Sequence, residues 1–148
     1  PALTAEGLLC RQYLGSPRDA PELTAGTALL LDSVTIDFGS NESPAWEKDI
    51  YAWYYITQVC HHLGGRPWQR WNAQLQSRVP AAQKSTGPEK GSWDPAYDQW
   101  GDVGGRLYAT CLCTCMLEVY YRHLPLYGEL PPASPPVTAA IPDAIPPH

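Results

Sequence analysis

A chain of 148 residues is long enough for one domain with its own hydrophobic core, and a net charge of -5 with only 10 scattered Lys and Arg residues argues against nucleic acid as a partner. The apolar residues are unusual in kind, because 6 Trp and 9 Tyr stand against 1 Phe and 1 Met. Trp and Tyr carry a polar tip and suit helix interfaces and pocket walls, and no apolar run approaches the length of a membrane span.

Two helices are expected in the first part of the chain. Residues 4–14 predict a short helix with Thr4 as its N-cap, and Gly15 marks its end. Residues 22–33 predict a second helix by the spacing of their apolar residues. The β-branched residues in 34–38 either extend this helix or form an irregular segment.

An aromatic helix is expected from Tyr51 to Leu63, where apolar residues occupy nearly every position. A helix that is apolar on most sides is buried on most sides, which predicts an inner helix with several neighbours. The pair Gly64-Gly65 ends it. The next helix carries an apolar stripe on one side only, which predicts an outer helix with its other side in water. This stripe consists of Trp68, Trp71, Leu75 and Val79.

A second helix that is apolar on most sides is expected from Leu107 to about His123. Together these patterns predict an all-α fold of about five main helices, arranged as helical hairpins over residues 1–127. Residues 128–148 contain seven prolines and no aromatic residue, which predicts a Pro-rich disordered tail.

The chain has five cysteines, an odd number, and no C-x-x-C pair. All five lie in predicted helices among apolar neighbours, which favours reduced, packed thiols over disulfides or metal ligands. Reduced thiols slightly favour a cytoplasmic location, although the compartment is otherwise not indicated by the sequence.

Three features carry a resemblance to a known repeat. The first is the inner helix followed across Gly64-Gly65 by the outer helix, and the second is the corner from Gln83 to Gly91-Ser92-Trp93. The third is Gly104-Gly105-Arg106 with the helix that follows it. Together they resemble the α/α-toroid repeats of the terpenoid (squalene) cyclase and protein prenyltransferase superfamily. The closest likeness is to the bacterial prenyltransferase/squalene-oxidase-repeat proteins of the planctomycete type.

The resemblance covers about residues 3–127 and implies a partial α/α toroid, the C-terminal part of a larger ring of helical hairpins. About two and a half hairpins are present, and a repeat array that stops early leaves an apolar face uncovered. We therefore expect further repeats of a longer parent chain, a homodimer, or an incomplete arc.

The resemblance also implies an aromatic-lined concave face that binds an apolar or isoprenoid ligand, or a protein partner. The candidate lining residues are Trp53, Tyr54, Trp68, Trp93, Trp100 and Tyr108. In the other interpretation, Gln83, Gly91 and Trp93 form a structural corner that joins neighbouring hairpins, with the glutamine amide capping a helix end.

The catalytic signatures of the superfamily, the D-x-D-D run of the cyclases and the D-x-C zinc signature of the prenyltransferases, are missing from this sequence. The sequence therefore predicts a binding or scaffold module with no catalytic residue, metal or cofactor. The alternative is the C-terminal part of a cyclase-like or prenyltransferase-like enzyme, whose catalytic acid would lie in upstream repeats.

Two local groups of polar residues are candidate sites. Asp94, Asp98 and Asp102 are spaced four apart and carry oxygen ligands for a hard cation, but nearby Pro and Gly favour turn and capping roles. His61 and His62 are adjacent, so they point to different sides of a helix and are expected to be satisfied helix-end histidines.

Overall fold

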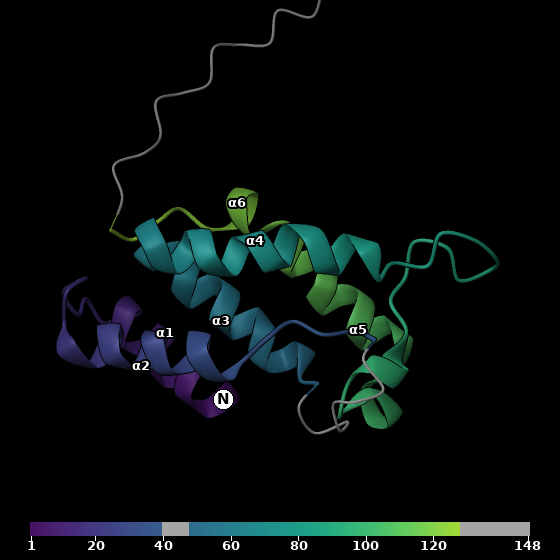
Figure 1. Ribbon diagram of the computed structural model, residues 1–148, viewed down its shortest axis with the longest axis horizontal. Helices are drawn as coiled ribbons and strands as arrows, with labels where there is room; N and C mark the ends of the chain where they lie inside the picture. The colour runs from purple at the N-terminus through teal and green to yellow at the C-terminus, as the bar shows by residue number, and fades with distance from the viewer. Residues whose placement is uncertain (40–47, 128–148) are drawn as a thin grey trace, which may run out of the picture.

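The computed structural model describes residues 1–39 and 48–127, and these residues contain helices and no strand. This confirms the all-α prediction, whereas the predicted Pro-rich tail, 128–148, lies outside the described residues. The helices are α1 (Ala2–Tyr13), α2 (Pro21–Ser33), α3 (Ile50–Leu63), α4 (Gly65–Ala81), α5 (Gly101–Leu117) and α6 (Val119–Arg122), with a 3-10 turn, η2, at Pro95–Tyr97 (Figure 1).

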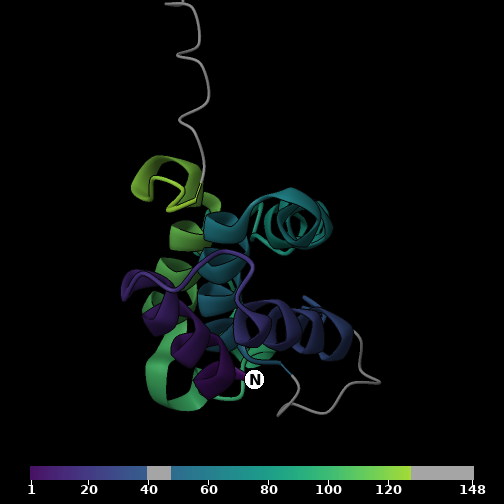
Figure 2. The same ribbon diagram turned by 90° about the vertical axis from the view of Figure 1, so that its left-hand side faces the viewer.

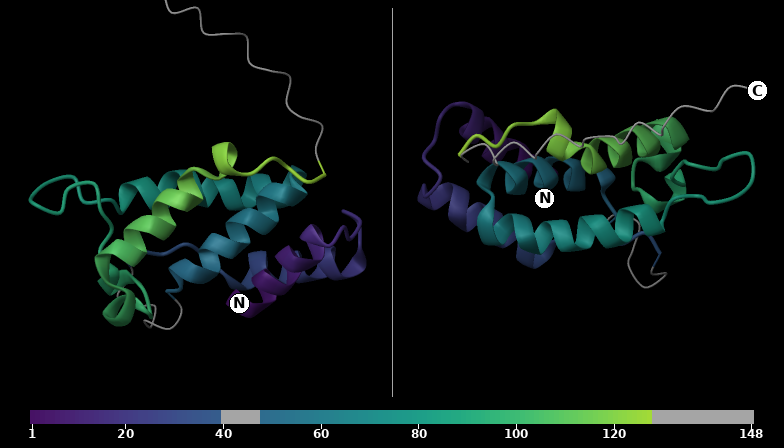
Figure 3. Two further views of the ribbon diagram at one scale, coloured as in Figure 1. Left: turned by 180° about the vertical axis from the view of Figure 1, so that it is seen from behind. Right: turned by 90° about the horizontal axis from the view of Figure 1, so that it is seen from above.

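The helices form two layers. Helices α1, α3 and α5 lie side by side and run in the same direction (Figure 3), and α2 and α4 cover one side of that layer (Figure 2). Helix α3 is the centre of the molecule, because it packs against α1, α4 and α5 and also contacts α2 and α6. The pairs α1–α2 and α3–α4 are therefore helical hairpins that lie next to each other.

Helix α3 is buried on nearly every side, as its sequence predicts. Eleven of its 14 residues are buried. Its start is fixed by Asp49, whose carboxylate accepts a hydrogen bond from the backbone N–H of Ala52 at 2.8 Å. It ends at Gly64, which adopts a φ of 63°. The observed helix begins at Ile50, one residue before the predicted start.

Helix α4 has the predicted amphipathic character. Trp71, Leu75 and Val79 are buried in the core, and Trp68 is half-buried. The indole N–H of Trp71 donates a hydrogen bond to the hydroxyl of Thr57 on α3 at 2.8 Å. The polar group of this buried tryptophan therefore has a partner within the apolar interface.

The start of the first helix differs from the prediction. Helix α1 begins at Ala2, and the side chain of Thr4 does not cap it. The backbone N–H of Ala5 already bonds to the carbonyl of Pro1 at 3.0 Å, so Thr4 lies inside the first turn and the predicted N-cap is wrong. Residues 34–38 are irregular, one of the two expected outcomes.

The last predicted helix is divided into two. Helix α5 begins at Gly101, six residues before the predicted start, and bends at Gly105, whose φ of 67° and ψ of -171° are not helical. A backbone with this φ and ψ is populated almost only by glycine. A second break at Glu118 separates α5 from α6, so the predicted continuous helix to His123 is wrong.

Helix α5 is also much less buried than its sequence predicts. Only Gly101, Ala109, Cys113 and Met116 are buried. The exposed residues include one before the bend at Gly105 and three after it, and we call them the α5 outer stripe: Val103, Leu107, Cys111 and Thr114. The described neighbours of α5 are α3, α4, α6 and η2, which contact only part of its circumference.

Candidate functional site

The structure does not bring the six predicted cavity-lining aromatic residues together. Trp53 is fully buried near the start of α3, where its ring packs edge to face on Phe38 with centroids 5.1 Å apart. Trp68 lies at the other end of α3, with its ring 5.2 Å from that of His61 and 5.3 Å from that of Tyr120. These two tryptophans therefore belong to opposite ends of the molecule.

The remaining four aromatics are also dispersed. Trp93 is buried beside the end of α4, whereas Trp100 is 53% exposed at the start of α5. Tyr54 on α3 and Tyr108 on α5 are half-buried, and both pack against the core. Trp53 borders a cavity of about 610 Å³, and none of these four lines it.

The predicted structural corner joins α4 to α5. The indole N–H of Trp93 donates to the carbonyl of Val79 at 2.7 Å, and the Arg106 guanidinium donates to the carbonyl of Trp93 at 3.2 Å. Gln83 donates to the carbonyl of Gly91 at 2.9 Å, within the corner itself. The end of α4 is thus capped by Trp93 and not by the glutamine amide, which corrects that detail of the prediction.

Asp98 and Asp94 serve as caps and turn residues, as expected. The Asp98 carboxylate accepts hydrogen bonds from the backbone N–H groups of Ile50 at 2.6 Å and Trp100 at 2.7 Å. The Asp94 carboxylate accepts from Ala96 at 3.1 Å. Over residues 1–39 and 48–127, no three His, Cys, Asp or Glu side chains are placed to hold one metal ion.

Three histidines meet at the end of α3. The ring nitrogen Nε2 of His61 lies 2.9 Å from the carbonyl oxygen of His123, and the ring of His62 lies 5.8 Å from that of His123. Burial lowers the pKa of His62 to about 4, and repulsion from His61 and His123 adds to the shift. This cluster holds the segment after α6 against α3.

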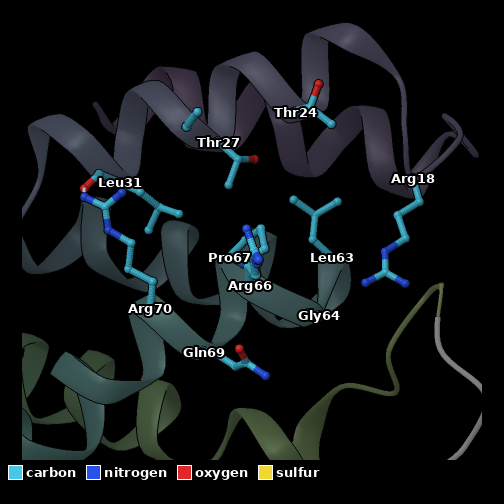
Figure 4. A pocket seen from close by; sticks show the side chains of 12 residues that line it. Arg18, Thr24, Thr27, Leu31, Leu63, Gly64, Arg66, Pro67, Gln69 and Arg70 are labelled. Carbon is cyan, nitrogen blue, oxygen red and sulfur yellow. Dashed lines mark hydrogen bonds between the residues drawn. The ribbon is translucent and has the colours of Figure 1, made fainter.

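The candidate binding site is a cavity of about 630 Å³ between α2 and the start of α4 (Figure 4). Its volume falls in the range of sites for small molecules. The lining residues are Arg18, Thr24, Thr27, Ala28, Leu31, Leu63, Gly64, Gly65, Arg66, Pro67, Gln69 and Arg70. This site was not predicted from the sequence. An available signal was the pair Gly64-Gly65, which stands before an arginine-containing helix and offers no side chain to cap it.

One end of this cavity is rich in positive charge. Gly64 and Gly65 adopt φ values of 63° and 56°, and no side chain caps the start of α4. The Nη2 atom of Arg18 lies 3.1 Å from the position that a Cβ would take at Gly65. A larger residue there would crowd the guanidinium, so the two glycines let Arg18 approach the first turn of α4.

The other end of the cavity is electrically balanced. Figure 4 shows Arg18 and Arg70 at opposite ends. The Arg70 guanidinium donates to the Asp32 carboxylate and to the carbonyl of Leu31, both at 2.8 Å. Arg18 and Arg66 make no ion pair or side-chain hydrogen bond within the part of the chain that the structure describes.

None of the helices among the described residues is both long enough and apolar enough to cross a membrane. Comparisons of this chain with protein-family models, with curated proteins and with solved structures find no match.

Proposed function

We propose that this chain is a non-catalytic helical-repeat module, of the α/α-toroid type that its sequence resembles, and that it binds another helical surface through the α5 outer stripe. The observation that supports this most directly is the exposure of Val103 and Leu107, which are 89% and 76% exposed. Val103 precedes the bend at Gly105, and Leu107 follows it on the part of α5 whose other side is fixed in the core by Cys113 and Met116.

The chemistry of this surface suits a packed partner helix better than a polar ligand. Residues 107–117 of α5 contain no charged side chain. After the bend at Gly105, the exposed residues Leu107, Cys111 and Thr114 follow at spacings of four and three, and the small Cys111 and Thr114 let a neighbouring helix approach closely. Contiguous apolar surface on a soluble domain marks interaction sites.

The opposite edge of the same layer has a similar character. Leu3 on α1 and Leu14 directly after it are 82% and 86% exposed, and Gly7 and Cys10 between them are exposed as well. Both outer helices of the α1–α3–α5 layer thus present apolar sides, which is the arrangement expected of hairpins taken from a longer array. The partner is accordingly another helical hairpin, from further repeats or from a second copy.

Sedimentation velocity over a range of protein concentrations tests the proposal, because the isolated chain can offer its own copies as partners. We expect concentration-dependent association that Leu107→Glu abolishes. The matched control is Leu29→Glu, because Leu29 is also exposed but lies on α2 in the other layer. A monomer at every concentration, or equal loss of association in both variants, contradicts the use of this stripe by a second copy.

The non-catalytic part of the proposal has its own test. Squalene and prenyl diphosphates are the substrates expected from the enzymatic alternative, so incubation with each, followed by product detection, addresses it directly. We expect no turnover by the 148-residue chain, and turnover would replace the scaffold proposal with the enzymatic one.

A further inference from the structure

We infer that the cavity between α2 and the start of α4 is a binding site for a small amphipathic anion, with a carboxylate or phosphate headgroup held at the Arg18 end and an apolar chain along the wall. This site is separate from the α5 outer stripe and does not depend on the function proposed for that surface.

The unpartnered side chain of Thr27 is the first observation that points to a ligand. Thr27 is 2% exposed, and its hydroxyl has no hydrogen-bond partner. On the same helix, the hydroxyl of Thr24 donates back to the carbonyl of Pro21 at 3.1 Å. Figure 4 shows the Thr27 side chain directed into the space between α2 and α4. Because a buried hydroxyl without a partner destabilises the fold, a ligand that accepts its hydrogen bond removes that cost.

The charges at the Arg18 end of the cavity define the headgroup. A helix N-terminus carries a partial positive charge, and its first N–H groups have no partners inside the helix. The Arg18 guanidinium nevertheless lies beside Gly65 in the first turn of α4, where like charges repel. Arg66 adds a third positive group, and none of the described residues that line the cavity is a carboxylate. An anion at this end would be bound by the Arg18 guanidinium and the start of α4, with Arg66 adding positive charge farther along the cavity.

The rest of the lining defines the other half of the ligand. Leu63, Pro67 and Leu31 form an apolar wall that continues from the charged end toward Arg70. Arg70 is already paired with Asp32, so it does not attract a second anion. A single headgroup with an apolar chain therefore matches the cavity better than inorganic phosphate or a ligand with two charged ends.

The test uses isothermal titration calorimetry on the full chain, with octyl phosphate and octanoate as probes and with 1-octanol and inorganic phosphate as partial probes. We expect saturable binding of at least one anionic probe and far weaker binding of both partial probes. Along the series butyl, hexyl and octyl phosphate, each buried methylene strengthens binding by about fourfold. Equal binding of 1-octanol, or no saturable binding of either anionic probe, overturns the inference.

Two variants locate the headgroup. Arg18→Gln weakens binding of the anionic probe by about tenfold to a hundredfold, since it removes a charge-assisted hydrogen bond. The matched control, Arg11→Gln, removes the same charge from an exposed residue of α1 outside the cavity and changes binding by no more than about twofold. Equal losses in the two variants would mean nonspecific attraction and would overturn the assignment.

Thr27→Val separates a ligand contact from a structural one, because valine keeps the shape and removes the hydroxyl. We expect a higher melting temperature for the free protein, since an unpartnered buried hydroxyl is lost, together with weaker binding of the probe. A lower melting temperature with unchanged affinity would make the hydroxyl structural and would remove Thr27 from the site.

Discussion

Helices α3 and α5 are both mainly apolar, yet their surroundings differ widely. In α3, 11 of 14 residues are buried, whereas in α5 only four of 17 are. Helix α3 lies between α1 and α5 in its own layer and is covered by α4, while α5 lies at the edge of that layer. The apolar pattern of a helix shows how much surface the helix can bury. The neighbouring helices decide how much of that surface is in fact buried.

The largest expected difference between the two regions is in the cost of removing a large side chain. Trp53→Ala removes a fully buried indole from α3, and we expect it to lower the free energy of unfolding by about 3 to 5 kcal/mol. Trp100→Ala at the start of α5 removes a half-exposed indole and is expected to cost about 1 kcal/mol or less. Urea denaturation measures both. Similar losses in the two variants would show that α5 is more deeply packed than its exposure indicates.

Local patterns predicted most of the helical architecture. The Gly64-Gly65 pair marked the boundary between α3 and α4, and the periodicity of Trp71, Leu75 and Val79 identified the buried side of α4. These features depend on residues close together in the sequence. The exposure of α5 was not predictable in this way, because it depends on which elements pack beside it.

The cavity between α2 and α4 was not predicted for a related reason. It is lined by Arg18, before α2, and by Gly64 and Gly65, more than 40 residues later in the chain. No spacing rule connects such distant positions. The unpartnered hydroxyl of Thr27 is likewise visible only once its surroundings are known, because most helical threonines bond to their own backbone.

The reactivity of individual cysteine thiols measures how the burial of α3 differs from that of α5. On α5, Cys111 is exposed, while Cys113 is buried and has its pKa raised by that burial. On α3, burial raises the pKa of Cys60 to about 12. Because the thiolate is the reactive form, we expect iodoacetamide to modify Cys111 in the native protein and Cys60 about a thousandfold more slowly.

Mass spectrometry after timed labelling identifies the modified cysteines. Labelling in denaturant is the control and should modify all five cysteines. If Cys113 reacts in the native protein as fast as Cys111, then α5 separates from α3 in solution and the buried side of α5 is not stably packed.

The pH dependence of stability tests the packing at the end of α3. The pKa of His62 is lowered to about 4, so the unfolded chain binds its proton at higher pH than the folded chain does. Stability is therefore full above about pH 7 and falls progressively as the pH drops from about 6.5 to about 4. The lowered pKa corresponds to about 3 kcal/mol, and screening by solvent reduces the expected loss to about 2 kcal/mol. Helix α5 contains no histidine.

The measurement is the urea midpoint at several pH values, compared between the wild-type chain and His62→Gln. The variant should lose most of this dependence while keeping the contributions of other titrating groups. An unchanged pH profile in His62→Gln would show that the buried histidine does not differ in protonation between the folded and unfolded chains.

The smallest expected effect concerns α1, the other edge of the layer. Gly7 lies inside this helix, and a Cβ built there has no atom within 4 Å apart from its own helix and its chain neighbours. Gly7→Ala should therefore raise the free energy of unfolding by about 0.5 to 1 kcal/mol, because alanine favours the helical backbone and meets no neighbour. At Gly26 on α2, a Cβ would lie 2.8 Å from the Leu8 side chain, so Gly26→Ala should gain less or lose stability. A loss at Gly7 would mean that this edge of α1 is covered in solution, as the buried sides of α3 are.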